Sequence, residues 1–170
     1  KEEERIKQEG RLPPGQSLTL KFPVLHYGPV PTFNATTWDF RAWGEVEEEK
    51  RWDWNEFNQL PRAKIQMDIH CVTRWSKVDT VWEGISVRSL VDSGLLTIKL
   101  TATHVMQHAE YGFTVNLPLE VVLAENFLLA THLNGVPIDA DHGYPLRGVV
   151  GFIPGHEGLE TPYFWKGAKW

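Results

Sequence analysis

Cys71 is the only cysteine of the chain, and it stands between His70 and, three residues further on, Arg74. A single thiol cannot form an internal disulfide or a metal site built from several thiolates. If Cys71 has a function, it acts alone, either as a nucleophile or as one soft ligand of a metal that other groups also hold. The alternative is a buried free cysteine that packs as a small hydrophobic side chain. His70 and Arg74 favour a function, because a histidine and an arginine are costly in a plain apolar core.

Basic side chains occur beside Cys71 and again near the end of the sequence. The charge of Arg74 would favour the thiolate form of Cys71, which suits both a nucleophile and a metal ligand. Arg147, Lys166 and Lys169 are three cations near small residues. This arrangement suits the binding of a phosphate group. The alternative is that they are solvated surface charges, as most charged residues are.

The histidines give little evidence of a metal site. None of the seven forms a recognised zinc-binding pair with another: His26, His70, His104, His108, His132, His142 and His156. His104 and His108 are four residues apart, but we predict a strand up to His104, which argues against a shared helical face. Each histidine taken singly is better explained as a structural residue. The sequence also contains neither a P-loop nor the spaced-glycine motif of dinucleotide-binding proteins.

The composition is that of a globular protein with one substantial core. The chain has 170 residues, of which 42% are hydrophobic and 23% charged, and it contains eight tryptophans. Its net charge of −5 makes it a poor nucleic-acid binder. No apolar run approaches the length of a membrane span. We expect a cytoplasmic protein, and a periplasmic location stays open because a removed signal leaves no trace.

Hydrophobic patterning predicts an α+β fold with mixed sheets and short helices, rather than a doubly wound βαβ fold. We predict a charged, flexible tail over residues 1–16 and one globular domain over 17–170. Alternating residues predict strands at 17–22, 37–46, 63–72, 97–104, 111–117, 127–133 and 136–138. Capping residues and prolines predict helices at 53–60, 86–91 and 118–125. The third predicted strand runs directly into Cys71, which places the thiol on a rigid support.

Five segments, taken in order, resemble motifs of the sulfite-oxidase-type molybdopterin oxidoreductases: 23–31 (PVLHYGPVP), 70–76 (HCVTRWS), 116–119 (NLPL), 142–147 (HGYPLR) and 165–170 (WKGAKW). The likeness is greatest to the small single-domain bacterial members, which are related to the catalytic subunit of the methionine sulfoxide reductase. It covers nearly all of the chain after residue 16. The resemblance implies a mixed α+β fold with a buried molybdopterin.

In that family, molybdenum is held by two dithiolene sulfurs of the pterin, by oxo or hydroxo ligands and by one cysteine thiolate. Cys71 matches the thiolate position, and a soft thiolate suits a metal already bound by sulfur. One cysteine is then sufficient, because the cofactor brings the other sulfurs.

The resemblance also implies roles for other residues. The positions that match family contacts to the pterin, its phosphate or the metal surroundings are His26, Tyr27, His70, His142, Arg147, Lys166 and Lys169. Arg74 or Tyr27 is expected to face the substrate. Leu25 stands where the sulfite oxidases carry an arginine that reaches the substrate anion.

The expected activity is two-electron oxygen-atom transfer on a small sulfoxide- or sulfite-like substrate. Leu25 favours reduction of a sulfoxide over oxidation of sulfite, because it carries no charge for the anion. Electrons are expected from a separate electron-transfer partner, since no haem or flavin motif is visible. The glycine-rich segment 151–158 is either a lid or a tolerated surface loop.

Two alternatives remain open. One is a cysteine-nucleophile enzyme with His70 or another histidine as the base, although neighbours in a strand point to opposite faces, which places His70 badly for this role. The other is a non-catalytic family member that keeps the fold without the cofactor.

Overall fold

The computed structural model describes residues 1–155 of the chain. Lys166 and Lys169 lie outside the described residues, as does the end of the glycine-rich segment 151–158. The described part contains three sheets with short helices between their strands, which confirms the predicted α+β class. No helix within residues 1–155 is both long and apolar enough to span a membrane.

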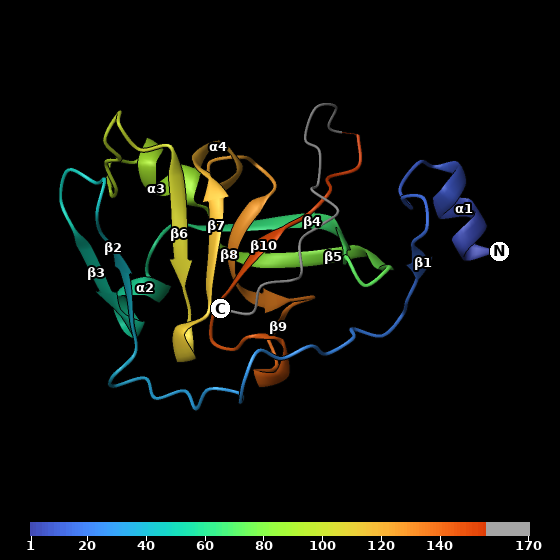
Figure 1. Cartoon of the computed structure of the whole chain (residues 1–170), viewed down its shortest axis with the longest axis horizontal. Coiled ribbons are helices and arrows are strands. Elements are labelled where there is room, and N and C mark those ends of the chain that lie inside the picture. Colours follow the sequence, from blue (N-terminus) through green and yellow to red (C-terminus); the bar gives the residue numbers. More distant parts are fainter. Residues whose placement is uncertain (156–170) are drawn as a thin grey trace.

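A six-stranded mixed sheet lies at the centre of the molecule (Figure 1). Its strands are β1 (Ser17–Leu18), β4 (Arg62–His70), β5 (Trp75–Ile85), β8 (Phe127–Leu133), β9 (Val136–Pro137) and β10 (Arg147–Val150). Strand β5 pairs antiparallel with β4, in parallel with β1 near its beginning, and antiparallel with β8 near its end. Strands β9 and β10 both pair with β8. Strand β5 therefore connects the N-terminal strand, the strand that leads to Cys71 and the later half of the sheet.

Two hairpins and the helices pack around this sheet. The hairpins are formed by β2 (Asp39–Ala42) with β3 (Lys50–Asp53), and by β6 (His104–His108) with β7 (Thr114–Pro118). The helices are α1 (Glu2–Gln8), α2 (Trp54–Asn58), α3 (Val87–Asp92) and α4 (Leu119–Val122), with 3-10 turns at Glu110–Gly112 and Ala140–His142. In Figure 1 the two hairpins lie towards one end of the molecule and α1 lies at the other.

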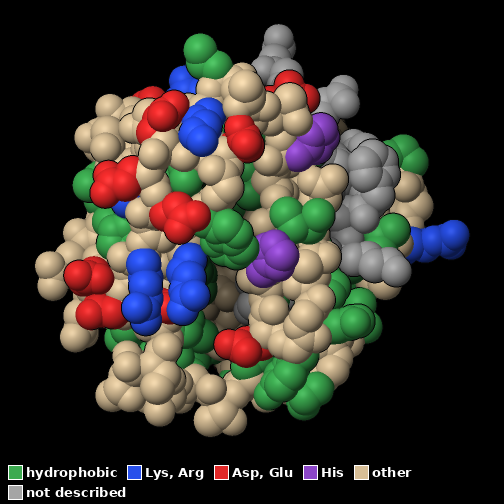
Figure 2. Space-filling view, turned by 60° about the vertical axis from the view of Figure 1, so that its left-hand side comes forward, with side chains coloured by type: hydrophobic (Ala, Val, Ile, Leu, Met, Phe, Trp, Pro, Cys, Tyr) green, Lys and Arg blue, Asp and Glu red, His purple; other side chains and the backbone are tan. Residues whose placement is uncertain are grey.

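Acidic and basic side chains are interspersed on the β2–β3 side of the molecule, which Figure 2 shows. On this hairpin, Arg41 and Arg51 both contact the carboxylate of Asp39, at 2.8 and 2.5 Å. Mixed, partnered charges of this kind are typical of a solvated face and do not form the basic surface that a polyanion needs.

Local signals in the sequence account for several elements. Asp53 accepts a hydrogen bond from the backbone N–H of Glu56, whose side chain accepts one from the backbone of Asp53, so that a capping box begins α2. At the start of α3, the side chain of Ser86 accepts a hydrogen bond from the backbone N–H of Ser89. Residues 134 and 135 both have positive φ, at 50° and 82°, as a two-residue hairpin turn requires. The predicted helices and the predicted β8–β9 hairpin are therefore confirmed.

Other elements differ from the prediction. The strand predicted over 97–104 is wrong, because only Ile98 bridges to Val46 and regular pairing starts at His104. The alternation of apolar and polar residues does not by itself make this segment a strand, because no neighbouring strand within residues 1–155 forms a continuous hydrogen-bond ladder with it. The longest strand, β5, was not predicted. Its register against β4 shifts near Asp79, whose φ is 55°, and this irregularity breaks the period-two pattern.

Buried side chains form two apolar clusters around the central sheet. The larger cluster includes Phe57, Ile85 and Phe127, and lies towards the two hairpins. The smaller includes Met67 and Trp82, and packs beneath the end of β4. Strand β4 therefore approaches Cys71 over a dense apolar base, which limits its motion.

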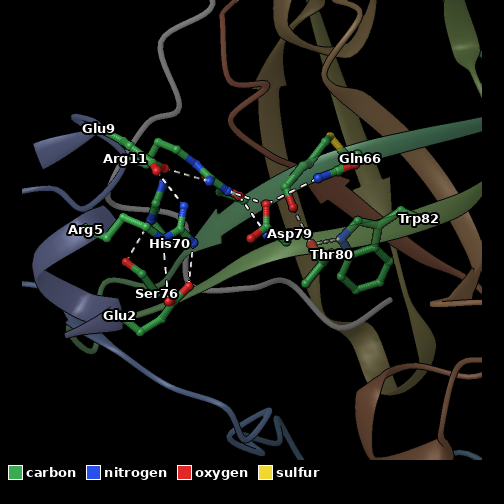
Figure 3. A network of polar contacts seen from close by, with 12 residues as sticks. Glu2, Arg5, Glu9, Arg11, Gln66, His70, Ser76, Asp79, Thr80 and Trp82 are labelled. Atoms are coloured by element: carbon green, nitrogen blue, oxygen red, sulfur yellow. Dashed lines mark hydrogen bonds and ion pairs between the residues drawn. The ribbon is translucent and has the colours of Figure 1, made fainter. Parts of the chain in front are cut away.

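Residues 1–16 do not form the solvated tail that the charged composition predicts. Ile6 of α1 is completely buried, and Leu12 is also buried. Arg11 donates two hydrogen bonds, from Nε and Nη2, to the fully buried carboxylate of Asp68, at 2.8 and 2.7 Å. Its Nη2 also contacts Asp79 at 2.6 Å (Figure 3). One bidentate ion pair thus attaches the N-terminal segment to β4 and β5.

Replacing Arg11 by methionine is expected to destabilise the protein by roughly 3–5 kcal/mol, the cost of leaving a buried carboxylate without its partner. Urea unfolding at pH 7 measures this loss. Adding Asp68→Asn should recover part of it, because the unpaired charge is then removed. Arg5→Met is the matched control, since Arg5 pairs with Glu2 and Glu9 on the exposed side of α1 and should change stability far less. Equal midpoints for Arg11→Met and Arg5→Met would contradict this role of Arg11.

Candidate functional site

Cys71 directly follows β4 and begins the tight turn that leads into β5. The N–H of Cys71 donates to the carbonyl of Trp75 at 2.9 Å, and the N–H of Arg74 donates back to the carbonyl of Cys71 at 3.0 Å. Arg74 adopts the left-handed conformation, with φ of 70°. The Cys71 sulfur lies 3.0 Å from the hydroxyl oxygen of Thr73. Local geometry therefore fixes the main chain on both sides of a buried thiol.

A cavity of about 200 Å³ opens beside Cys71. Its described walls come from β4, β5, β7, β8 and β10, from the turn that contains Cys71 and Thr73, and from the segment 22–25. Most of the lining is apolar, and the polar side chains among it are His70, Cys71, Thr73 and Arg147. The cavity thus combines one thiol and one cation in a largely apolar space, as small-molecule sites commonly do.

Arg147 is buried at the beginning of β10, and its guanidinium lies beside a pair of aromatic rings that contact each other edge-on. The guanidinium carbon is 5.5 Å from the ring centre of Phe22 and 5.6 Å from that of Trp82. Nη1 donates to the carbonyl of His142 at 3.0 Å. Within residues 1–155, Nε has no hydrogen-bond partner. Burial lowers the pKa of Arg147 to about 10, against an opposing effect of Cys71, so that the side chain still carries its charge at pH 7.

An unpartnered, buried guanidinium N–H is unusual, because buried polar groups are nearly always paired. Leaving such a group unpaired costs about 1–3 kcal/mol, and more for a charged group, whereas one hydrogen bond contributes about 1 kcal/mol net. The Nε of Arg147 therefore indicates an acceptor that a bound molecule supplies, and its charge favours an anionic one.

His142 supports the segment that borders the cavity. Its Nε2 donates to the carbonyl of Phe22 at 3.0 Å, and Nδ1 lies 3.2 Å from a carboxylate oxygen of Asp139. The ring also meets Phe22 edge-on, with centroids 4.0 Å apart. Gly143 follows with φ of 109°, and a Cβ there would come within 3.1 Å of Arg147. This glycine allows the chain to turn closely over the arginine.

His70 is buried at the end of β4 and contacts Ser76 at the beginning of β5. Its Nδ1 lies 2.8 Å from the hydroxyl of Ser76, which donates to Oε1 of Gln16 at 3.1 Å. Gln16 in turn donates from Nε2 to the carbonyl of Cys71 at 2.9 Å. Burial lowers the pKa of His70, although the nearby carboxylate of Asp68 partly opposes this effect. His70 is consequently neutral at pH 7.

The structure brings some of the predicted site residues together and leaves others apart. Cys71, His70 and Arg147 line one cavity. His26 lies 3.3 Å from Asp141 at the surface, and neither it nor the predicted substrate-facing residues, Tyr27 and Arg74, is among the described lining residues. Tyr27 is 62% exposed and packs against Phe113, with ring centroids 4.9 Å apart.

Sequence reasoning missed Phe22 and Trp82, which line the cavity, and Gln16 and Asp68, which support the Cys71 turn and the strand before it. Phe22 directly precedes the PVLHYGPVP segment, so its position next to that motif could have indicated it. The contact between Gln16 and Cys71 joins residues 55 apart, and that between Arg11 and Asp68 residues 57 apart. No local pattern signals such pairs.

The pH dependence of stability should report the buried state of His70. Because the pKa of His70 is lowered in the folded protein, the unfolded state takes up its proton at higher pH, and stability falls as the pH drops below about 6.5. His70→Asn is expected to remove this contribution, so that the metal-free variant loses less stability than the parent between pH 7 and pH 5. Urea midpoints across this range measure the difference. Parallel curves for the two proteins would contradict the expectation.

Comparison with known proteins identifies the family. The model of the "oxidoreductase molybdopterin binding domain" matches residues 27–170. The chain is 42% identical over 164 residues to the uncharacterized oxidoreductase YuiH of Bacillus subtilis (strain 168), covering 96% of this chain and 77% of that protein. It is 26% identical to nitrate reductase [NADH] 2 of Phaseolus vulgaris, over 78% of this chain but only 18% of the plant protein.

The fold is also found in a solved structure. The sulfane dehydrogenase SoxCD from Paracoccus pantotrophus superimposes with a TM-score of 0.63 at 17% identity, covering 75% of this chain and 37% of that chain. At this identity the likeness shows the fold alone. The family match and the identity to YuiH confirm the resemblance seen in the motifs, and the chain belongs to the oxidoreductase molybdopterin-binding domain family of sulfite-oxidase type.

Proposed function

We propose that Cys71 is the protein ligand of molybdenum in a bound molybdopterin, and that the domain catalyses oxygen-atom transfer on a small, uncharged substrate such as a sulfoxide. The observation that carries the proposal is the Nε of Arg147, a buried donor without a partner within residues 1–155, in the same cavity as the chain's single thiol. A soft thiolate and a buried cation are complementary to a sulfur-bound metal and an anionic cofactor.

The described residues fit molybdopterin because the cofactor brings most of the metal's ligands itself. Within residues 1–155, no group of three or more His, Cys, Asp or Glu side chains is placed to hold a metal ion. A metal at Cys71 therefore needs ligands from a bound molecule. Arg147 would pair with the anionic part of that molecule. Lys166 and Lys169, which match the family's basic segment, are proposed to bind its phosphate.

When bound, molybdopterin supplies a metal centre that exchanges two electrons together with an oxygen atom. The chain itself positions and shields the reacting groups. The hydroxyl of Thr73 lies within reach of the Cys71 sulfur and can donate to the thiolate. The apolar side chains of Phe22 and Trp75 line the cavity and exclude water from it. Arg147 supplies positive charge that balances the thiolate and the cofactor.

The described rim of the cavity favours a substrate without charge. Val24 and Leu25 line it, and both are substantially exposed. Leu25 also occupies the position at which the sulfite oxidases carry an anion-binding arginine. Arg147, the cation among the described lining residues, already packs against two rings and is bonded to a carbonyl. Reduction of a sulfoxide consumes two electrons and two protons and yields a sulfide and water, and a separate electron-transfer partner would supply the electrons.

The proposal is tested first by metal and pterin analysis of protein made in a molybdenum-replete host. We expect about one molybdenum and one pterin per chain, and reduction of a small dialkyl sulfoxide with a reduced viologen dye as electron donor. Cys71→Ser should lower turnover by more than about 100-fold, beyond the usual cost of losing an outer-shell partner of a metal, while the pterin stays bound. Val72→Ser, which changes the exposed neighbour, is the control and should remain active.

Three outcomes of that experiment would contradict the proposal. Well-folded protein without molybdenum would favour the cofactor-free alternative. An active Cys71→Ser variant would remove Cys71 from the metal. Loss of activity in Cys71→Ser together with rapid alkylation of Cys71 in an active, metal-free parent would favour a cysteine nucleophile.

Arg147→Met separates cofactor binding from folding. The variant is expected to bind several-fold less pterin per chain than the parent. The fluorescence of the oxidised pterin released from the protein measures this amount. The metal-free form of the variant should unfold at a urea concentration equal to or higher than that of the parent, because a buried charge with an unpaired N–H has been replaced by an apolar side chain. Arg41→Met, on the exposed face of β2, should retain the pterin. Full pterin content in Arg147→Met would remove this residue from the cofactor site.

A further inference from the structure

The N-terminal segment reaches the Cys71 turn although it precedes the part of the chain that the family model matches. That match begins at residue 27. Strand β1 nevertheless pairs with the beginning of β5, and the backbone N–H groups of Ser17 and Thr19 donate to the carbonyls of Arg74 and Ser76 at 3.0 and 2.9 Å. Residues before the matched domain thus support the far side of the turn that begins at Cys71.

Gln16 makes the contact nearest to the thiol. Its Nε2 donates to the carbonyl oxygen of Cys71 at 2.9 Å, and its Oε1 accepts from the buried hydroxyl of Ser76 at 3.1 Å. The same hydroxyl contacts Nδ1 of His70 (Figure 3 shows His70 and Ser76). Gln16 is therefore linked directly to Cys71 and Ser76 and, through Ser76, to His70. Both polar atoms of the Gln16 amide are therefore in use.

These contacts determine how the Cys71 peptide is oriented. The carbonyl of Cys71 accepts from the N–H of Arg74 as well as from Gln16, which occupies both of its lone pairs. The turn includes the left-handed conformation of Arg74, which a side-chain-bearing residue adopts only when its surroundings hold it. The thiol has a single rotatable bond, so a fixed peptide limits the sulfur to three staggered positions around the Cα–Cβ bond.

We propose that Gln16 is a positioning residue for Cys71, which sets the direction of the sulfur in the cavity by holding the Cys71 carbonyl. The N-terminal segment is then part of the active site. Its attachment is independent of Gln16, because Arg11 pairs with Asp68 at one end and His142 bonds the carbonyl of Phe22 at the other. The consequence for metal ligation rests on the proposed function, whereas the effect on the thiol does not.

The first test uses metal-free protein and measures the rate at which iodoacetamide alkylates Cys71 at constant pH. We expect Gln16→Ala and Gln16→Met to accelerate alkylation roughly two- to tenfold, the range that corresponds to the net contribution of one hydrogen bond. Gln16→Met keeps about the length of the side chain, removes the donor and adds no charge near the thiolate. Gln8→Ala, an exposed glutamine on the same segment, should match the parent.

A control variant that is destabilised as much as the Gln16 variants distinguishes an effect on the position of the thiol from a general loss of stability. Ile85→Val removes one methylene from the larger core cluster, away from Gln16, and is expected to lower stability about as much as one lost hydrogen bond. Urea midpoints verify the match. Faster alkylation in the Gln16 variants, but not in Ile85→Val, supports the proposal. An unchanged rate in the Gln16 variants, or the same acceleration in Ile85→Val, overturns it.

The second test uses protein loaded with molybdenum. Gln16→Ala should retain the pterin, shift the thiolate-to-metal absorption band and lower kcat with little change in KM, because the ligand direction changes and the substrate surface does not. An absorption band identical to that of the parent would overturn the role in ligation. If the parent binds no molybdenum, the proposed function fails, and the alkylation comparison still decides whether Gln16 positions the thiol.

Discussion

The ion pair between Arg11 and Asp68 is the interaction on which the Cys71 site depends. Asp68 is fully buried and lies opposite the irregularity in β5, where its carboxylate also accepts the N–H of Asp79 at 2.9 Å. Alternating exposure along β4 ends at this point, and every residue from 67 to 71 is buried. One face of this half-strand rests on the apolar cluster of Met67 and Trp82, and the N-terminal segment covers the other. Cys71 therefore leaves a strand that is enclosed on both sides.

A half-buried arginine, Arg11, and a fully buried one, Arg147, differ in how their charges are partnered. Arg11 is matched by Asp68 and Asp79, so its charge is compensated within the fold. Arg147 packs against two aromatic rings, donates to one carbonyl, and has an unpartnered Nε within residues 1–155. Burying a charge in this manner is costly unless something else completes it. The first arginine stabilises the chain as it stands, whereas the second is the residue that we propose to be completed by a ligand.

What the sequence predicts correctly depends on short-range signals. The caps at Asp53 and Ser86 and the turn at 134–135 act within four residues, and each marks an observed element. The strand that leads to Cys71 was also predicted, because apolar and polar residues alternate regularly along its first half. The docked N-terminal segment was not, since α1 is highly charged and buries only Ile6. The contacts of the site with Gln16 and Arg11 span more than 50 residues, and the chain's composition carries no sign of them.

The N-terminal segment connects the two sides of the cavity. Gln16 holds the carbonyl of Cys71 on one side, and six residues later Phe22 covers the guanidinium of Arg147 on the other, where His142 bonds its carbonyl. A displacement of this segment would therefore disturb the thiol and the cation together. The family model matches the chain only from residue 27, so Gln16 and Phe22 contact Cys71 and Arg147 from outside the matched part. A domain that began at residue 23 would keep all five motifs and lack both contacts, so the motifs alone do not provide the complete surroundings of the thiol and the cation.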